Sequence, residues 1–272
     1  MRCLPLTLLL LPGATLAGPW TRDAGQLYAK AGQSVFVADA FRDATGQLQG
    51  GVDYLGVTSA LYLELGLLDG LHLQVYLPHT AATNAVSANG NRYLSAGGGD
   101  AQLGLQARLP LPFPAAVRGV VKAPLYDVGA IKGRDAMFFP QRGDGQVDAT
   151  ATLSVGHAFG SLPLYAFGEI GHQWRTERYA GVGAEAAYGD GLVWTAQVGW
   201  TVMPGVGLAV AASGVAPYRE DDVTKGYTTV GPSLYIPLAA RLALELGYDE
   251  IVQARNSARG RQASLGISFN LQ

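Results

Sequence analysis

The chain has 272 residues and a formal net charge of −2, and it contains 37 glycines although only 15% of its residues are charged. With this small negative charge, no basic field suggests nucleic acid, so we expect no nucleic-acid partner. Abundant glycine with little charge is typical of a chain of many strands and turns, and the length suits one large β-domain.

The N-terminus has the pattern of a secretory signal peptide, residues 1–17. Arg2 precedes a leucine-rich core, Leu4–Leu11, and small residues lead to an expected cleavage site after Ala17. Residues 18–272 then form the mature domain. The only cysteine, Cys3, leaves with the signal, so the mature chain has neither disulfides nor a thiolate metal site. The chain has no later run of 18 apolar residues, so the sequence predicts no transmembrane helix.

Apolar and polar residues alternate in a series of segments along the rest of the chain. A period of two puts the apolar side chains on one face of a strand and the polar ones on the other. In the hairpin expected across residues 99–124, Leu105 therefore points outward and Gln106 inward. The predicted strands cover residues 25–38, 51–65, 71–77, the two arms of the hairpin in 99–124, 146–155, 163–174, 192–202, 206–213, 227–236, 240–251 and 261–271.

The connections between these strands alternate in length. Short turns rich in proline or glycine alternate with longer polar segments, which we expect to be loops. These segments are residues 39–50, 79–98, 125–145, 175–191 and 215–226. A soluble β-sandwich also alternates apolar and polar faces, but it has no reason to sort its loops in this way. Outer-membrane barrels have short periplasmic turns, longer extracellular loops and an even strand number. The sequence predicts an all-β fold, a single transmembrane antiparallel up-and-down β-barrel of about 12 strands.

Several segments resemble the MetA-pathway of phenol degradation family of outer-membrane transporter-like β-barrel proteins. They agree with it in order and spacing over most of the mature chain. The segments are LYLELGLLDGLHLQVYLPH, the Gly98-Gly99-Asp100 strand start with AQLGLQARL, VKAPLYD, GDGQVDATATLSVGHAF, LYAFGEIGHQWR and LELGYDEIVQARNSARGRQASLGISF.

The resemblance implies an integral barrel in the outer membrane of a Gram-negative cell envelope, porin-like in build, that transports small hydrophobic or aromatic compounds. Its partners are then outer-membrane lipid, the barrel-assembly machinery and a small-molecule solute. The chain departs from the aromatic last residue common in such barrels, because it ends Phe269-Asn270-Leu271-Gln272. A structural barrel with a plugged lumen is the alternative, and an outer-membrane hydrolase is a third hypothesis.

Charged and polar residues of the inward faces are the candidate functional residues. Both signs occur, so the side chains either fill the lumen as paired braces or line a selective pathway. The lumen-facing candidates are Lys30, Glu64, His72, Gln102, Arg108, Arg118, Lys122, Asp148, Glu169, Arg241, Glu245 and Asp249. Arg108 and Arg118 flank one short turn, where they form either a positive constriction that favours anions or two paired braces.

Catalytic and metal-binding patterns are missing from the sequence. A serine nucleophile needs a base within hydrogen-bond reach, and no His-x-Ser occurs on any strand face. The acidic segments at residues 143–145, 189–191 and 220–222 lack the alternating ligand spacing of a calcium loop, so we interpret them as turns and solvated charge. We expect no enzymatic activity, no catalytic or metal-ligating residues and no cofactor.

Overall fold

The structure is a computed structural model that describes residues 18–127, 138–160, 162–175 and 188–271. Within these ranges there is no helix long and apolar enough to cross a membrane. The strands are β1 (Leu27–Arg42), β2 (Leu48–Gln49), β3 (Val52–Leu68), β4 (Leu71–Val86), β5 (Asn91–Gly98), β6 (Asp100–Arg108), β7 (Ala115–Pro124), β8 (Asp148–Phe159), β9 (Leu164–Arg175), β10 (Gly191–Met203), β11 (Val206–Pro217), β12 (Gly226–Ala239), β13 (Leu242–Arg255) and β14 (Ser257–Leu271).

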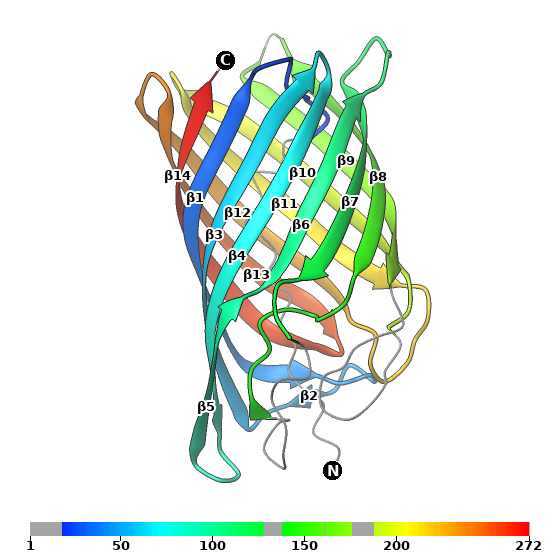
Figure 1. Ribbon diagram of the computed structural model, residues 1–272, viewed down its shortest axis with the longest axis vertical. Coiled ribbons are helices and arrows are strands. Elements are labelled where there is room, and N and C mark those ends of the chain that lie inside the picture. The colour runs from blue at the N-terminus through cyan, green and yellow to red at the C-terminus, as the bar shows by residue number, and fades with distance from the viewer. Residues whose placement is uncertain (1–17, 128–137, 161, 176–187, 272) are drawn as a thin grey trace.

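Twelve of these strands close into one antiparallel barrel, as the sequence predicts. Each pairs with the next along the chain, and β14 pairs with β1 from Leu27 opposite Leu271 to Arg42 opposite Ser257. Closure leaves no unpaired edge in the ring, which is the condition for a β-structure to cross a bilayer. The two remaining strands lie outside the ring, β2 beside β1 and β5 beside β4 (Figure 1).

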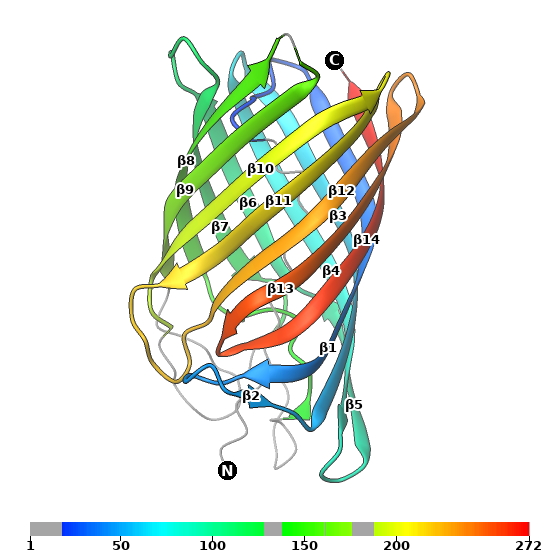
Figure 2. The ribbon, with the colours of Figure 1, turned by 180° about the vertical axis from the view of Figure 1, so that it is seen from behind.

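The two ends of the barrel differ, and Figure 2 shows both ends with the tilted strands β10–β13 in front. The end with the short turns also holds the start of β1 and the end of β14, and we call it the turn end. The opposite end carries the long connections and is called the loop end. The segment expected to be the signal peptide, residues 1–17, lies outside the described residues.

The loop predicted across residues 79–98 is in fact a hairpin that extends the barrel wall at the loop end. The β3–β4 ladder continues to Val52 opposite Val86, and β5 pairs with β4 from Gly98 opposite His79 to Asn91 opposite Val86. The prediction was wrong because residues 80–85 of β4, where this extension begins, are threonine, alanine and asparagine. These residues lack the large apolar side chains of a membrane-facing strand, yet the pairing satisfies the backbone.

Glycine lets a loop cross the barrel wall where the extension ends. Gly97 has a φ of 143°, and a Cβ at this position would lie 1.9 Å from Nη1 of Arg142. An L side chain would be both strained and obstructed there. The glycine run therefore lets the chain leave β5 and lets residues near Arg142 pass close by.

The distribution of apolar and polar side chains in the barrel is the inverse of that in a soluble protein. Its exposed face is leucine- and valine-rich, with Leu103, Leu105 and Ile267 about half exposed, whereas Glu64, His72 and Asp148 are buried inside. This distribution suits an apolar exterior around a polar interior. One small apolar cluster lies within the lumen towards the loop end, formed by Phe36, Ala38, Tyr54, Ala82 and Ala258, with Ile251 packed against it.

Candidate functional site

A short segment before β1, residues 18–26, lies at the turn end and enters the lumen there (Figure 1). We call it the N-terminal segment. Arg22 Nε donates to Glu64 Oε2 at 2.8 Å, and the backbone N–H of Arg22 donates to Nδ1 of His72 at 3.2 Å. Glu64 and His72 are inward residues of β3 and β4, so the wall of the barrel anchors the segment by its arginine.

The beginning of the N-terminal segment packs deeper into the lumen. The Gln106 amide donates to the carbonyl oxygen of Gly18 at 2.8 Å. The Trp20 ring meets those of Tyr165 and Phe167 edge-on, with centroids 5.7 and 6.2 Å away. Pro19 is buried. This stretch therefore contacts the polar side chain of Gln106 and the aromatic rings of Tyr165 and Phe167.

Two backbone hydrogen bonds fasten the end of the N-terminal segment to β3. The N–H of Gly25 donates to the carbonyl of Gly66 at 3.0 Å, and the N–H of Gly66 donates to the carbonyl of Gln26 at 2.8 Å. A Cβ at Gly66 would lie 1.8 Å from the carbonyl oxygen of Asp23. The close approach of the two backbones therefore requires glycine at position 66.

Ion pairs brace the middle of the barrel. Lys30 Nζ donates to Oε2 of Glu245 at 2.8 Å, while the hydroxyl of Tyr28 donates to the other carboxylate oxygen. Arg118 pairs with Glu169 across β7 and β9. Each of these four charges is neutralised by its partner, so the pairs contribute no net charge to the lumen.

Cavities remain between these braces. One, of about 470 Å³, runs along β10–β13, reaching Gly205 and Tyr235 near the turn end and Ser257 near the loop end. A second, of about 260 Å³, lies in mid-barrel, and both are bordered by Lys30, Thr195 and Ser213. We call the larger one the central chamber. Its size is within the range of small-molecule binding sites.

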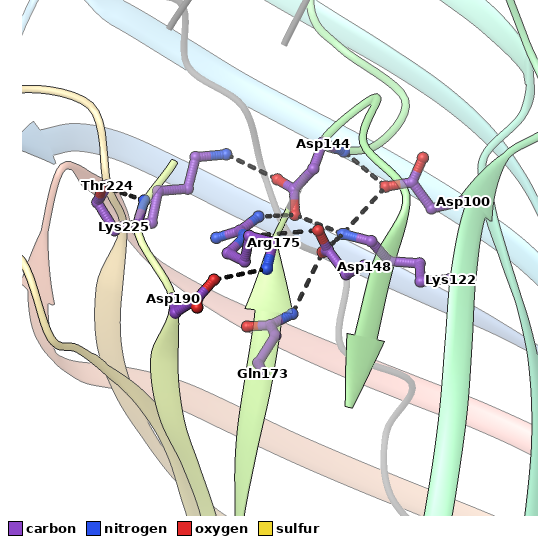
Figure 3. Close-up of polar contacts among 10 residues, drawn as sticks. Asp100, Lys122, Asp144, Asp148, Gln173, Arg175, Asp190, Thr224 and Lys225 are labelled. Carbon is purple, nitrogen blue, oxygen red and sulfur yellow. Dashed lines mark hydrogen bonds and ion pairs between the residues drawn. The ribbon is translucent and has the colours of Figure 1, made fainter. Parts of the chain in front are cut away.

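A cluster of buried charges closes the loop end, and Figure 3 shows Asp144 at its centre. Asp144 accepts from Lys122 Nζ at 2.8 Å, from Arg175 Nη2 at 3.0 Å and from Lys225 Nζ at 3.0 Å. Lys122 also contacts Asp148 at 2.6 Å, and Asp100 accepts the backbone N–H of Asp144 at 2.6 Å. We call these six residues the loop-end cluster; they join β6–β9 to the connections around residues 144 and 225.

Three carboxylates and three cations balance in the loop-end cluster. Burial alone would raise the pKa of Asp144, but Lys122, Lys225 and Arg175 outweigh it and hold that pKa well below its ordinary value of 3.8. Burial lowers the pKa of Lys225 to about 8, against the opposing attraction of Asp144. The turn expected at residues 143–145 is thus not solvated, because its aspartate is fully buried among cations.

The structure places most of the predicted lumen residues on the inner wall. Residues that line the cavities or lie in the buried ion-pair and hydrogen-bond networks are Lys30, Glu64, His72, Gln102, Arg118, Lys122, Asp148, Glu169, Glu245 and Asp249. Arg108 has the inward parity but lies at the rim of the turn end, half exposed and 3.9 Å from Asp23. Arg241 is an exposed residue of the β12–β13 turn.

The predicted positive constriction at Arg108 and Arg118 is not formed. Arg118 is paired with Glu169, and Arg108 lies near Asp23 at the rim, so the two arginines do not share one uncompensated site. The alternative prediction, that these arginines are paired braces, is correct for Arg118, which pairs with Glu169.

Several residues of the site were missed from the sequence. Arg175 was assigned to a loop because the apolar alternation of β9 ends at Trp174, although its parity with Phe167 and Glu169 is inward. Nothing periodic marks Arg22 or Asp144, which lie in connections and meet their partners only after the barrel closes.

The four histidines lie among aromatic and amide groups or at the surface. His72 contacts Gln74 Nε2 at 2.9 Å, and Nδ1 of His172 lies 3.1 Å from the Tyr218 hydroxyl. Across the described residues, none of the histidines hydrogen-bonds to a serine, and no group of three or more His, Cys, Asp or Glu residues is arranged to hold a metal ion.

A scan against models of protein families finds no match, and a search of curated proteins finds none either. Solved structures do match over nearly the whole chain. An outer membrane channel from Pseudomonas putida F1 has 14% sequence identity and a TM-score of 0.72, covering 92% of this chain and 97% of that chain. The translocator domain of autotransporter NalP from Neisseria meningitidis has 11% identity and a TM-score of 0.53, covering 92% and 90%. A KdgM porin in complex with disordered oligogalacturonate has 6% identity and a TM-score of 0.50, covering 89% and 99%.

At identities this low, the similarity to these structures establishes the fold alone. The closed antiparallel barrel, its apolar exterior and these neighbours define an integral outer-membrane β-barrel protein. Since short turns are periplasmic in such barrels, we assign the turn end to the periplasm and the loop end to the cell exterior.

Proposed function

We propose that this protein is an outer-membrane channel for small molecules, closed at rest by the N-terminal segment on the periplasmic side and by the loop-end cluster outside. The observation that carries the proposal is the central chamber, about 470 Å³ of space inside a closed barrel between these two elements. A barrel filled for strength alone would pack side chains into this space, since voids forfeit dispersion contacts.

The chamber also suggests the route. It reaches the periplasmic end along β10, β11 and β12, near Gly205, whereas the N-terminal segment is fastened to β3, β4, β6 and β9. A modest shift of the segment away from β10–β12 would widen this route without unfolding the barrel.

The solutes we propose are small amphipathic compounds with an apolar or aromatic body. The resemblance to the MetA-pathway family supports this class, and so do the aromatic rings beside the route, among them Tyr165 and Phe36. Two of the similar structures are a channel and a porin, which supports passage of solutes rather than catalysis. We propose that the protein is not an enzyme and needs no cofactor.

A structural barrel with a plugged lumen is the second candidate. The buried braces favour it, because Arg22–Glu64, Lys30–Glu245 and Arg118–Glu169 all tie lumen groups together. The central chamber argues against it.

Export and assembly complete the proposal. Cleavage after Ala17 would leave Gly18 as the first residue, which lies next to Gln106 inside the lumen. The barrel-assembly machinery would insert the chain, and outer-membrane lipid would contact its leucine-rich exterior.

Liposome swelling tests the proposal. Vesicles that contain the purified protein should swell in small sugars, which do not cross the lipid by themselves, faster than protein-free vesicles, and a variant lacking residues 18–24 should accelerate swelling further. If both proteins leave swelling at the protein-free rate, the plugged structural barrel replaces the channel.

A further inference from the structure

One carboxylate in the central chamber has no partner. Asp249 faces the chamber from β13, between outward Tyr248 and Glu250, and makes no hydrogen bond or ion pair within the described part of the chain. The other inward carboxylate of this strand, Glu245, is satisfied by Lys30 and Tyr28. The chamber thus carries one negative charge that no neighbouring group offsets.

Asp249 lies in a row of three chemically different side chains on the inner wall. In the strand register it is opposite Gln262 of β14, which is opposite Phe36 of β1. Two strand spacings, about 10 Å, therefore separate the backbones of Asp249 and Phe36. Ile251, two residues from Asp249 on the same face, packs against the apolar cluster that contains Phe36.

The wall around this row leaves space for a molecule. Gly231, Ser213 and Gly247 border the same chamber and have little or no side chain. The result is a concave site with an apolar end at Phe36 and Ile251, an amide in the middle and a free carboxylate at the other end. Such a mixture of apolar surface and few polar groups is typical of small-molecule sites.

We propose that Asp249, Gln262 and Phe36 form a binding site for small organic cations, in which the carboxylate takes a primary ammonium group and Phe36 with Ile251 takes an apolar or aromatic body. A carboxylate binds an ammonium through charge-assisted hydrogen bonds, and an aromatic ring adds attraction for the cation and its body. A single carboxylate cannot supply the six to eight oxygens of a calcium site. This proposal rests on the proposed function, because it names the class of solute that the channel selects.

The test uses 2-phenylethylammonium as probe and phenylacetate as an anion of similar size. In planar bilayers the ammonium should reduce the current through the native protein, and phenylacetate should not. Asp249→Asn should weaken this block about tenfold or more, the worth of a charge-assisted hydrogen bond, while Asp249→Glu should retain most of it. Asp53→Asn is the matched control, since that aspartate is exposed on the outward face of β3. Equal block of native protein and Asp249→Asn, or equal block by phenylacetate, would overturn the site.

Calorimetry of the probe with the full-length mature protein in detergent separates this site from the channel. Binding that Asp249→Asn weakens, with no current in any variant, would leave the site standing and refute the channel. Current without binding of the probe would refute the site and leave the channel standing. The heat-induced shift in electrophoretic mobility confirms that each variant is folded.

Discussion

Arg22 Nε lies 2.8 Å from Glu64 Oε2, and this pair joins the N-terminal segment to the barrel wall at β3. Glu64 is 2% exposed and also accepts from the Tyr62 hydroxyl at 2.8 Å, so the wall holds the carboxylate ready for the arginine. Arg22 is 22% exposed and can reach water if the segment moves. The pair therefore fastens a movable segment to a fixed wall.

Glu64→Gln should release the N-terminal segment. The expected cysteine-free mature chain allows a single Thr21→Cys probe, and a membrane-impermeant maleimide should label it about tenfold faster in the Glu64→Gln background. That factor corresponds to the loss of one hydrogen bond to a charged group. Glu220→Gln is the control, since it removes a carboxylate paired with Arg255 at the loop end. Equal labelling rates in both backgrounds would show that the ion pair does not hold the segment.

Gly66→Ala should displace the N-terminal segment without changing any charge. The added methyl would lie 1.8 Å from the Asp23 carbonyl oxygen, so the two backbones must separate. The Thr21→Cys probe should again label faster, with the barrel still heat-modifiable. Gly119→Ala is the control, because nothing lies within 4 Å of its added Cβ. Unchanged labelling in Gly66→Ala would contradict the placement of the segment.

Leu105→Arg should destabilise the barrel by about 2–4 kcal/mol, the cost of arginine on the lipid face at mid-membrane. Leu105 is half exposed on the outer wall, whereas Gln102 of the same strand lines a cavity. Gln102→Arg should therefore cost much less in urea-unfolding experiments in detergent or lipid. Gln102 is a better partner for this comparison than Gln106, which donates to Gly18. A larger cost for the lumen variant would mean that the faces are reversed.

Acid should open the loop-end cluster. The pKa of Asp144 in the closed form lies well below 3.8, so the stabilisation is complete above about pH 4 and is lost as the pH falls towards the lower pKa. Lys225 acts in a different window: its pKa of about 8 lies below the ordinary 10.5, so closure gains stability between those two values as the pH rises. Hydrogen exchange of residues 138–147, corrected for the intrinsic effect of pH, measures closure.

Protection of this segment in the native protein should stay constant down to about pH 4 and then fall as the pH is lowered towards about pH 2. Asp144→Asn should remove most protection at every pH, because loss of one member of a buried charged network costs about 3–5 kcal/mol. Protection that persists unchanged down to about pH 2, or that Asp144→Asn leaves intact, would refute the role of Asp144.

Strand alternation was sufficient to predict the barrel, because the period of two is a local property that survives folding. It placed Leu105 outside and Lys30, Glu169 and Glu245 inside. Loop parity also predicted that both termini of the ring lie at the end with the short turns, as they do. The β4–β5 extension was not predicted, because residues 80–85 of β4 are paired but include no large apolar side chain.

The closing elements could not be predicted in the same way. Arg22 and Asp144 belong to irregular segments, and their partners lie 42 residues away at Glu64 and 81 residues away at Lys225. Such contacts depend on the register of the closed barrel and on where a connection folds inward, neither of which leaves a local pattern. Strand parity also predicted wrongly that Arg241 faces the lumen. Parity does not show where a strand begins, and Arg241 lies in the turn before β13.

Single-channel conductance in planar bilayers tests the central claim most directly, with the native mature protein compared with Gly66→Ala. We expect small, discrete current steps for the native protein and a larger conductance or open probability for Gly66→Ala, with Gly119→Ala like the native protein. Folded protein that gives no current steps in either the native or the Gly66→Ala form would contradict a channel closed by its N-terminal segment.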